Sequence, residues 1–151
     1  MHRSLPAAVP AALLAPILCA PLLLVAAPAH AGTRGTLAID DTRVFAPDNP
    51  SGDATTSLPG CPHATSVDQR AKGLGTPVKG IFIGLRDFQC GGGSGFVVRL
   101  QATFGEGGSS GTWSITKSYG ALAGLSGSGT LVGEPVEGGI IDHYSGAITV
   151  H

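Results

Sequence analysis

The side chains best suited to chemistry, histidines and carboxylates, are few and scattered along the chain. Beyond the first 31 residues the histidines are His63, His143 and His151, with no H-x-H or H-x-x-x-H spacing. Zinc needs several His or Cys ligands held close together, so we expect no metal site. His143 falls on the expected polar face of its strand, where a solvated side chain is the ordinary outcome.

Asp142 is the weak candidate for a catalytic residue. It interrupts an apolar series, Ile140, Tyr144 and Ile148, on the face of the last segment that we expect to point inward. A carboxylate inside a small β-barrel must find a hydrogen-bond donor or shift its pKa. Asp142 is therefore either a structural acceptor, the role we favour, or part of a pocket.

Three further patterns have ordinary structural explanations. Residues 107–111, GGSSG, match the G-x-S-x-G pattern of hydrolase nucleophile elbows, but a Gly-rich linker precedes the Ser and a strand follows it, so we expect a hairpin loop. Asp40 and Asp41, with residues 48–53, could offer oxygens to calcium, but the spacing is not that of an EF-hand and an Asp-rich turn is favoured. No P-loop, dinucleotide fingerprint or Cys-x-x-Cys occurs, so we expect no cofactor.

The first 31 residues have the organisation of a secretory signal peptide. A basic start ending at Arg3 precedes an uncharged apolar stretch from Ala7 to Ala29, and Ala31 completes an A-x-A cleavage site. A membrane anchor is the competing interpretation, and Pro10, Pro16 and Pro21 within the stretch count against it. Lipid attachment at Cys19 is a third interpretation, but Leu18 precedes that cysteine where a bacterial lipoprotein signal has Gly, Ala or Ser. We predict cleavage after Ala31 and a secreted domain of residues 32–151 with no stable membrane anchor.

Removing this peptide changes the chemistry of what remains. Two cysteines are left, Cys61 and Cys90, and in an oxidising exterior such a pair is best interpreted as one disulfide. The nine Lys and Arg less Arg3 leave eight, against ten Asp and Glu, a net charge of −2. This nearly balanced charge does not indicate binding to nucleic acid. The length of residues 32–151 suits one domain.

The remaining sequence is glycine-rich and alternates as half-buried strands do. All 24 glycines lie in residues 32–151 and interrupt every helical period, so we expect an all-β domain. Expected strands are Gly95 to Phe104, with Phe96 inward, Gly111 to Tyr119, with Trp113 inward, Ile140 to Val150, Ile81 to Phe88 and, more weakly, Thr36 to Phe45. Gly/Ser clusters between them predict an antiparallel meander over Ile81 to Val150. Residues 46–77 show no comparable pattern, so we expect an irregular segment there. Either it hides a strand near Thr65 to Arg70, or the disulfide fastens it to the end of the strand that begins at Ile81.

The second half of the chain resembles the secreted bacterial relatives of allene oxide cyclase and dirigent proteins. The resemblance covers roughly Phe88 to Val150 and is carried by residues 111–115, GTWSI, 120–130, GALAGLSGSGT, 140–146, IIDHYSG, and Cys90 before 93–96, GSGF. It departs from the family pattern at Ser118, where Gly is expected, and at Leu122, where an aromatic is usual. It implies a small antiparallel, calycin-like β-barrel with an apolar interior, and leaves function open because one fold hosts many functions.

Three functional hypotheses follow. The first is a non-enzymatic exported barrel that binds an apolar small molecule or a surface partner, with Trp113, Tyr144, Phe96 and Ile148 lining the interior; the same side chains could instead fill it. The second, implied by the resemblance, is an isomerase or stereochemical guide steered by Asp142. The third is a structural or interaction protein of the cell envelope, with the Gly-rich loops and residues 46–77 as its contact surface. Oligomeric state is left undetermined.

Overall fold

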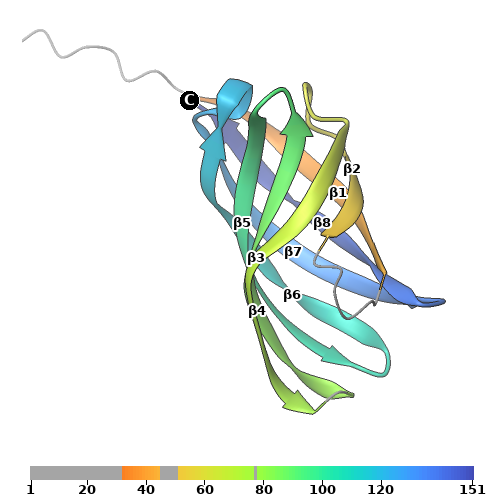
Figure 1. Cartoon of the computed structure of the whole chain (residues 1–151). Coiled ribbons are helices and arrows are strands. Elements are labelled where there is room, and N and C mark those ends of the chain that lie inside the picture. Colours follow the sequence, from red (N-terminus) through yellow and green to blue (C-terminus); the bar gives the residue numbers. More distant parts are fainter. Residues whose placement is uncertain (1–31, 45–50, 77) are drawn as a thin grey trace, which may run out of the picture.

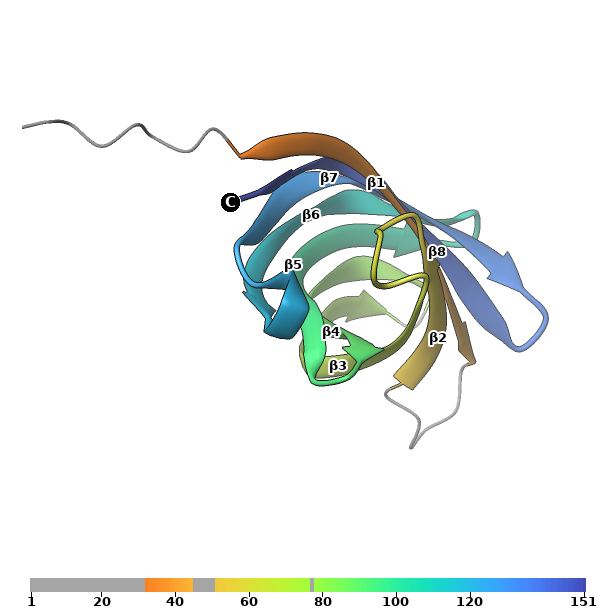
Figure 2. The ribbon, with the colours of Figure 1, turned by 90° about the horizontal axis from the view of Figure 1, so that it is seen from above.

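The protein is an eight-stranded closed antiparallel β-barrel, which confirms the expected fold class (Figure 1). The computed structural model describes residues 32–44, 51–76 and 78–151. Every strand pairs with its neighbours in sequence, and β1 pairs with β8 to close the barrel, as the view along the barrel shows (Figure 2). The elements are β1 (Thr33–Val44), β2 (Ser51–Thr56), β3 (His63–Thr76), β4 (Lys79–Gly91), β5 (Ser94–Gly105), β6 (Gly108–Tyr119), the 3₁₀ turn η1 (Gly120–Leu122), β7 (Leu125–Val136) and β8 (Gly139–Val150).

In the strands that the sequence predicted, buried and exposed side chains alternate, as β5 shows. In β5, Phe96, Val98, Leu100 and Ala102 are buried, while Arg99, Gln101 and Thr103 are exposed. Val97 is the exception: it was expected on the polar face but is buried. The register of β5 against β6 shifts at this position, and the Thr116 hydroxyl donates to the Val97 carbonyl.

The irregular segment expected over residues 46–77 is wrong for most of its length. It contains β2 and β3, and the alternative of a strand near Thr65 to Arg70 lies within β3. Apolar alternation could not show these strands, because their inward residues are small or polar, Ala54, Ala64 and Ser66, and residues 69–76 are all exposed. Backbone pairing with β4, from Thr65↔Gln89 to Thr76↔Lys79, holds β3 in place instead. Residues 46–50 and 77 lie outside the described residues, as does the expected signal peptide.

Aromatic side chains fill one half of the barrel. Phe88 stacks on Phe96 with ring centroids 5.2 Å apart, and Tyr144 meets Phe88 edge-on at 5.5 Å and Trp113 at 6.4 Å. Gly146 makes room for the indole, because a Cβ at that position would lie 2.7 Å from Cζ2 of Trp113. This half of the barrel is therefore a packed core with little free space.

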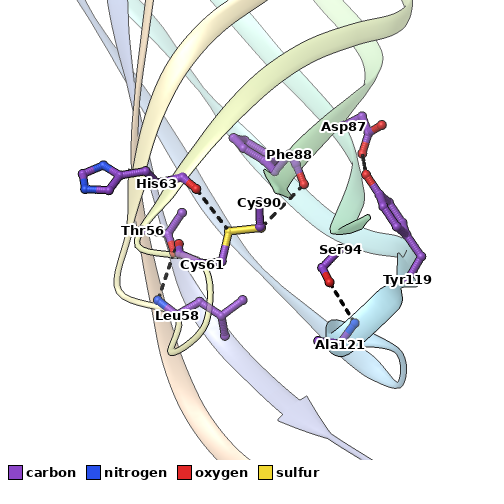
Figure 3. Close-up of a disulfide and its surroundings, with 10 residues drawn as sticks. All are labelled: Thr56, Leu58, Cys61, His63, Asp87, Phe88, Cys90, Ser94, Tyr119 and Ala121. Carbon is purple, nitrogen blue, oxygen red and sulfur yellow. Dashed lines mark hydrogen bonds between the residues drawn. A yellow bond between two sulfur atoms is a disulfide. The ribbon is translucent and has the colours of Figure 1, made fainter. Parts of the chain in front are cut away.

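The disulfide closes the packed end. Cys61 and Cys90 are bonded, with Cα atoms 5.0 Å apart, which confirms the expected pairing. The bond ties the β2–β3 connection to the end of β4, and Leu58 in that connection is buried against the core (Figure 3). The connection is further held by the Leu58 amide, which donates to the Thr56 hydroxyl at 3.0 Å. Within the described ranges, no helix has the length and apolar character needed to cross a membrane.

Candidate functional site

A cavity of about 610 Å³ occupies the end of the barrel remote from the disulfide. Its rim is formed where β1 ends, at the β3–β4 and β5–β6 turns, and near the end of β7. Its walls are apolar and its floor is charged. The wall residues include Phe82, Leu100, Ala102, Phe104, Leu131, Pro135 and Ile140; Arg43, Asp68, Arg86 and Asp142 lie among the charged residues that line it.

Arg86 of β4 is the centre of the floor. Its Nη1 lies 2.8 Å from Oδ2 of Asp41, 2.7 Å from Oδ2 of Asp142 and 2.6 Å from the Tyr144 hydroxyl, and its Nε donates to Oδ1 of Asp68 at 2.8 Å. Because Nη1 carries only two hydrogens, its three acceptors share them. Four strands, β1, β3, β4 and β8, thus meet at one guanidinium.

Arg43 of β1 extends the floor toward β3. It donates through Nη2 to Oδ2 of Asp68 at 2.9 Å and through Nη1 to the Ser66 hydroxyl at 2.9 Å. Ser66 in turn donates to Oδ1 of Asp41 at 2.6 Å. We refer to Asp41, Arg43, Asp68, Arg86 and Asp142 together as the ionic cluster. Three carboxylates and two guanidiniums make its formal charge −1 when all are ionised.

Burial is the largest single influence on the pKa values of Asp41, Tyr144 and Arg86. It raises the pKa of the fully buried Asp41, although Arg86, Ser66 and Arg43 act in the opposite direction. Burial also raises the pKa of the Tyr144 hydroxyl and outweighs the nearby Arg86. For Arg86 burial lowers the pKa, but Tyr144 and the three carboxylates together outweigh it and raise the pKa. The guanidinium is therefore held firmly in its charged form.

The structure brings only one of the predicted site residues to the cavity. Asp142 points inward, is buried and lines the floor, so it is both a hydrogen-bonded acceptor and part of a pocket. Trp113, Tyr144, Phe96 and Ile148 are buried inside the barrel, but they belong to the packed core and not to the cavity lining. Tyr144 touches the floor from below through its hydroxyl. A ligand-binding role for these four residues stays a prediction.

The remaining candidates are dispersed. His143 lies on the outer face of β8 and meets Asp40 of β1, with Nδ1 2.6 Å from Oδ1. Asp40 and Asp41 point to opposite sides of β1, so they do not converge on one ion. Ser109 and Ser110, of the G-x-S-x-G stretch, stand at the start of β6, after the β5–β6 turn, and Ser109 lines the cavity. His63, near the start of β3, lines a second and more open depression of about 700 Å³ on the barrel wall, for which the described residues offer no cluster of metal-binding side chains.

Sequence reasoning missed four of the five residues in the ionic cluster. A signal for three of them was present: in β1, Leu37, Ile39, Asp41 and Arg43 follow one another at every second position, so the two charged residues share the inward face of the two apolar ones. Arg86 lies two positions before the inward Phe88. Opposite charges at inward positions of neighbouring strands predict a buried network. Asp68 had no such signal, because β3 lacks apolar alternation.

The comparisons with known proteins add little. No family model matches the chain, and no curated protein matches it. Among solved structures it is similar to a protein of unknown function of the DUF3224 family from Shewanella oneidensis MR-1. The two share 13% identity with a TM-score of 0.38, over 76% of this chain and 96% of that one. A likeness this distant carries nothing about function.

Proposed function

We propose that this protein is a non-enzymatic binding protein that takes up an apolar small molecule in the open end of its barrel. The observation that carries the proposal is the cavity itself, with apolar walls built from β4, β5, β7 and β8 and a charged floor below them. Ligand sites in proteins are concave and mostly apolar with a few placed polar groups, and the mouths of β-barrels are a common place for them.

The walls predict a dependence on ligand size. Each methylene removed from water contributes about 0.8 kcal/mol, or roughly a fourfold gain in affinity. Affinity for a series of straight-chain ligands should therefore rise steadily with chain length and level off when the chain fills the cavity. A ligand held on the outer surface would show no such limit.

Binding can be measured with N-phenyl-1-naphthylamine, a neutral apolar dye that becomes fluorescent on leaving water. Trp113 is the only tryptophan of the chain and lies inside the barrel, so energy transfer from it to the dye reports entry. We expect saturable binding to the wild-type protein. The absence of both dye fluorescence and energy transfer would overturn the proposal.

A pair of matched variants localises the dye. Ala102 is buried in the cavity wall, so Ala102→Phe should fill the space and abolish binding. Ala147→Phe places the same ring on the outer face of β8, where residue 147 is exposed, and should leave binding unchanged. Thermal unfolding of both variants checks that they are folded. Equal binding by the two would place the dye outside the cavity.

Export is part of the same proposal. The disulfide suits an oxidising compartment, and residues 1–31 have the composition of a signal peptide. Expression of the full chain in a secreting bacterial host should yield, outside the cell membrane, a product that begins at Gly32 and is 2 Da lighter than its reduced form. An intact N-terminus on the recovered protein would contradict this.

One observation favours a second candidate, the isomerase or stereochemical guide. Asp142 lines the cavity beside Arg86, so a reactive intermediate held there would meet a carboxylate and a guanidinium together. The test is the chirality of the products formed when a phenol is coupled by a one-electron oxidant. An enantiomeric excess that needs the wild-type protein and disappears with Asp142→Asn would support guidance, and a racemic product would exclude it for that phenol.

A further inference from the structure

Two polar atoms at the cavity floor have no hydrogen-bond partner among the residues that the structure describes. The hydrogen bonds of Arg86 use Nε and Nη1, which leaves Nη2, and the bond of Asp142 uses Oδ2, which leaves Oδ1. No buried side-chain nitrogen or oxygen of the described residues lacks a hydrogen-bond partner, so Nη2 and Oδ1 must both retain contact with the cavity. The two groups are neighbours, since Nη1 and Oδ2 lie 2.7 Å apart.

Both groups are otherwise held rigidly. The side chains of Arg86 and Asp142 are 4% and 8% exposed, and Arg86 is fixed by bonds to residues of three other strands. Gly133 of β7 lets the carboxylate approach the backbone closely, because a Cβ there would lie 2.6 Å from Oδ1 of Asp142 and closer still to Oγ of Ser109. The floor therefore presents a fixed donor, the Nη2 hydrogens, next to a fixed acceptor.

The charge of the ionic cluster selects against charged ligand heads. A carboxylate head would be repelled by three aspartates and attracted by only two guanidiniums. An ammonium head would have only donors to offer to Nη2 of Arg86, which is itself a donor. Either charged head would also lose its hydration on entering the barrel, at a cost of several kcal/mol. A neutral head that donates once and accepts once satisfies both open atoms and avoids that cost.

We propose that the bound molecule carries a hydroxyl, or another neutral head that both donates and accepts, at the end of its apolar body. The hydroxyl hydrogen is donated to Oδ1 of Asp142, and the hydroxyl oxygen accepts from Nη2 of Arg86. This inference rests on the proposed binding function and specifies the chemical class of its ligand.

Four ligands with the same eight-carbon chain test it by displacing N-phenyl-1-naphthylamine at neutral pH. They are 1-octanol, octyl methyl ether, octanoate and octylammonium. The ether keeps the acceptor oxygen but has no hydrogen to donate, so its comparison with the alcohol isolates the bond to Asp142. A hydrogen bond to a charged group predicts an affinity about tenfold or more higher for 1-octanol than for the ether. We expect octanoate to bind most weakly.

A matched pair of variants tests the role of Asp142. Asp142→Asn removes one negative charge and replaces the charged acceptor by a weaker neutral one, so the preference of 1-octanol over octanoate should narrow by about tenfold. Asp87→Asn makes the same change on β4, where Asp87 accepts from Tyr119, Gln69 and Gln89, away from the cavity lining. It should leave the preference unchanged. The ratio of two affinities within one variant does not depend on the fraction of protein that is folded.

The outcomes are distinguishable. If the dye does not bind, the proposed function fails. If the dye binds and all four ligands displace it equally, or a charged ligand displaces it best, the head-group inference fails and the binding function stands. If Asp142→Asn does not fold, the comparison of alcohol with ether in the wild-type protein still decides, and equal affinities for those two overturn the inference.

Discussion

The substitution Arg86→Leu tests whether the ionic cluster depends on its central guanidinium. In the structure Arg86 donates to Asp41, Asp68, Asp142 and Tyr144, all at 2.6–2.8 Å. Leucine keeps much of the apolar stem but removes every one of these bonds. It leaves three carboxylates at the floor with Arg43 as the remaining cation of the ionic cluster, and Asp142 then has no bond to a cation of the cluster.

The size of the loss in stability follows from that geometry. Removing one partner of a buried ion pair costs about 3–5 kcal/mol, because the other charge is left uncompensated. For a domain of this size, between the ranges known for smaller and larger domains, each kcal/mol lowers the melting temperature by about 4 °C. We therefore expect Arg86→Leu to melt about 12–20 °C lower than the wild-type protein at pH 7.

The pH dependence identifies the cause. Burial raises the pKa of Asp41, and Arg86 is the strongest influence that lowers it, so loss of the guanidinium raises the folded-state pKa of Asp41 further. The contribution of this carboxyl to stability is then present at low pH and is lost as pH rises through the folded pKa. The deficit of the variant should therefore be smaller near pH 4 than at pH 7.

The assay is urea unfolding followed by circular dichroism at both pH values. The control is Arg99→Leu, which removes an exposed arginine from the outer face of β5. A loss within about 1 kcal/mol of the control would refute the reasoning, because exposed charges contribute about that much. A deficit that does not change with pH would refute the electrostatic cause.

Three further predictions concern the disulfide and two titrating groups. Reduction of the Cys61 to Cys90 bond, 29 residues apart in sequence, should lower the free energy of unfolding by roughly 2–4 kcal/mol, and a double Ser variant should show the same loss without responding to reductant. Burial raises the folded pKa of Asp41, so its stabilising contribution is present below the unfolded value near 3.8 and is lost as pH rises through the folded pKa. The difference in unfolding free energy between wild type and Asp41→Asn should therefore fall across that pH window. A difference that stays constant with pH would contradict the raised pKa. Burial, with the hydrogen bond and charge of Asp87, raises the pKa of Tyr119 to about 12. Tyrosinate absorbance should therefore appear only near that pH in the wild-type protein, and at lower pH in Asp87→Asn. A titration midpoint near 10 in the folded wild-type protein would contradict this prediction.

The strands that the sequence predicted are those in which local pattern and burial agree. In β5 the inward residues are apolar and most outward ones polar, so alternation alone places Phe96 and Leu100 inside. The disulfide was predictable for a different reason: if residues 1–31 are cleaved, as the sequence predicts, only Cys61 and Cys90 remain and they can pair only with each other. Both inferences need only the chain itself and the compartment in which it folds.

The strands β2 and β3 needed the tertiary structure. Their inward side chains are too small or too polar to stand out, and backbone bonds to strands on either side hold them in extended form. Their sequences are compatible with turns when considered alone. Pairing between strands is a property of the whole barrel, which local composition does not encode.

The sequence left open whether the barrel interior is filled or holds a cavity. The sequence determined that this is an all-β domain with an apolar interior, one disulfide and an inward-facing Asp142. Only the tertiary structure decided that four aromatic side chains, Phe88, Phe96, Trp113 and Tyr144, gather at one end. It also decided that Arg86 meets Asp41 and Asp142 from 45 and 56 residues away. The physical reason is that alternation tells which face a side chain takes, while strand register tells its height along the barrel. The packed core and the open cavity are lined by the same inward faces of the strands and differ only in their position along the barrel.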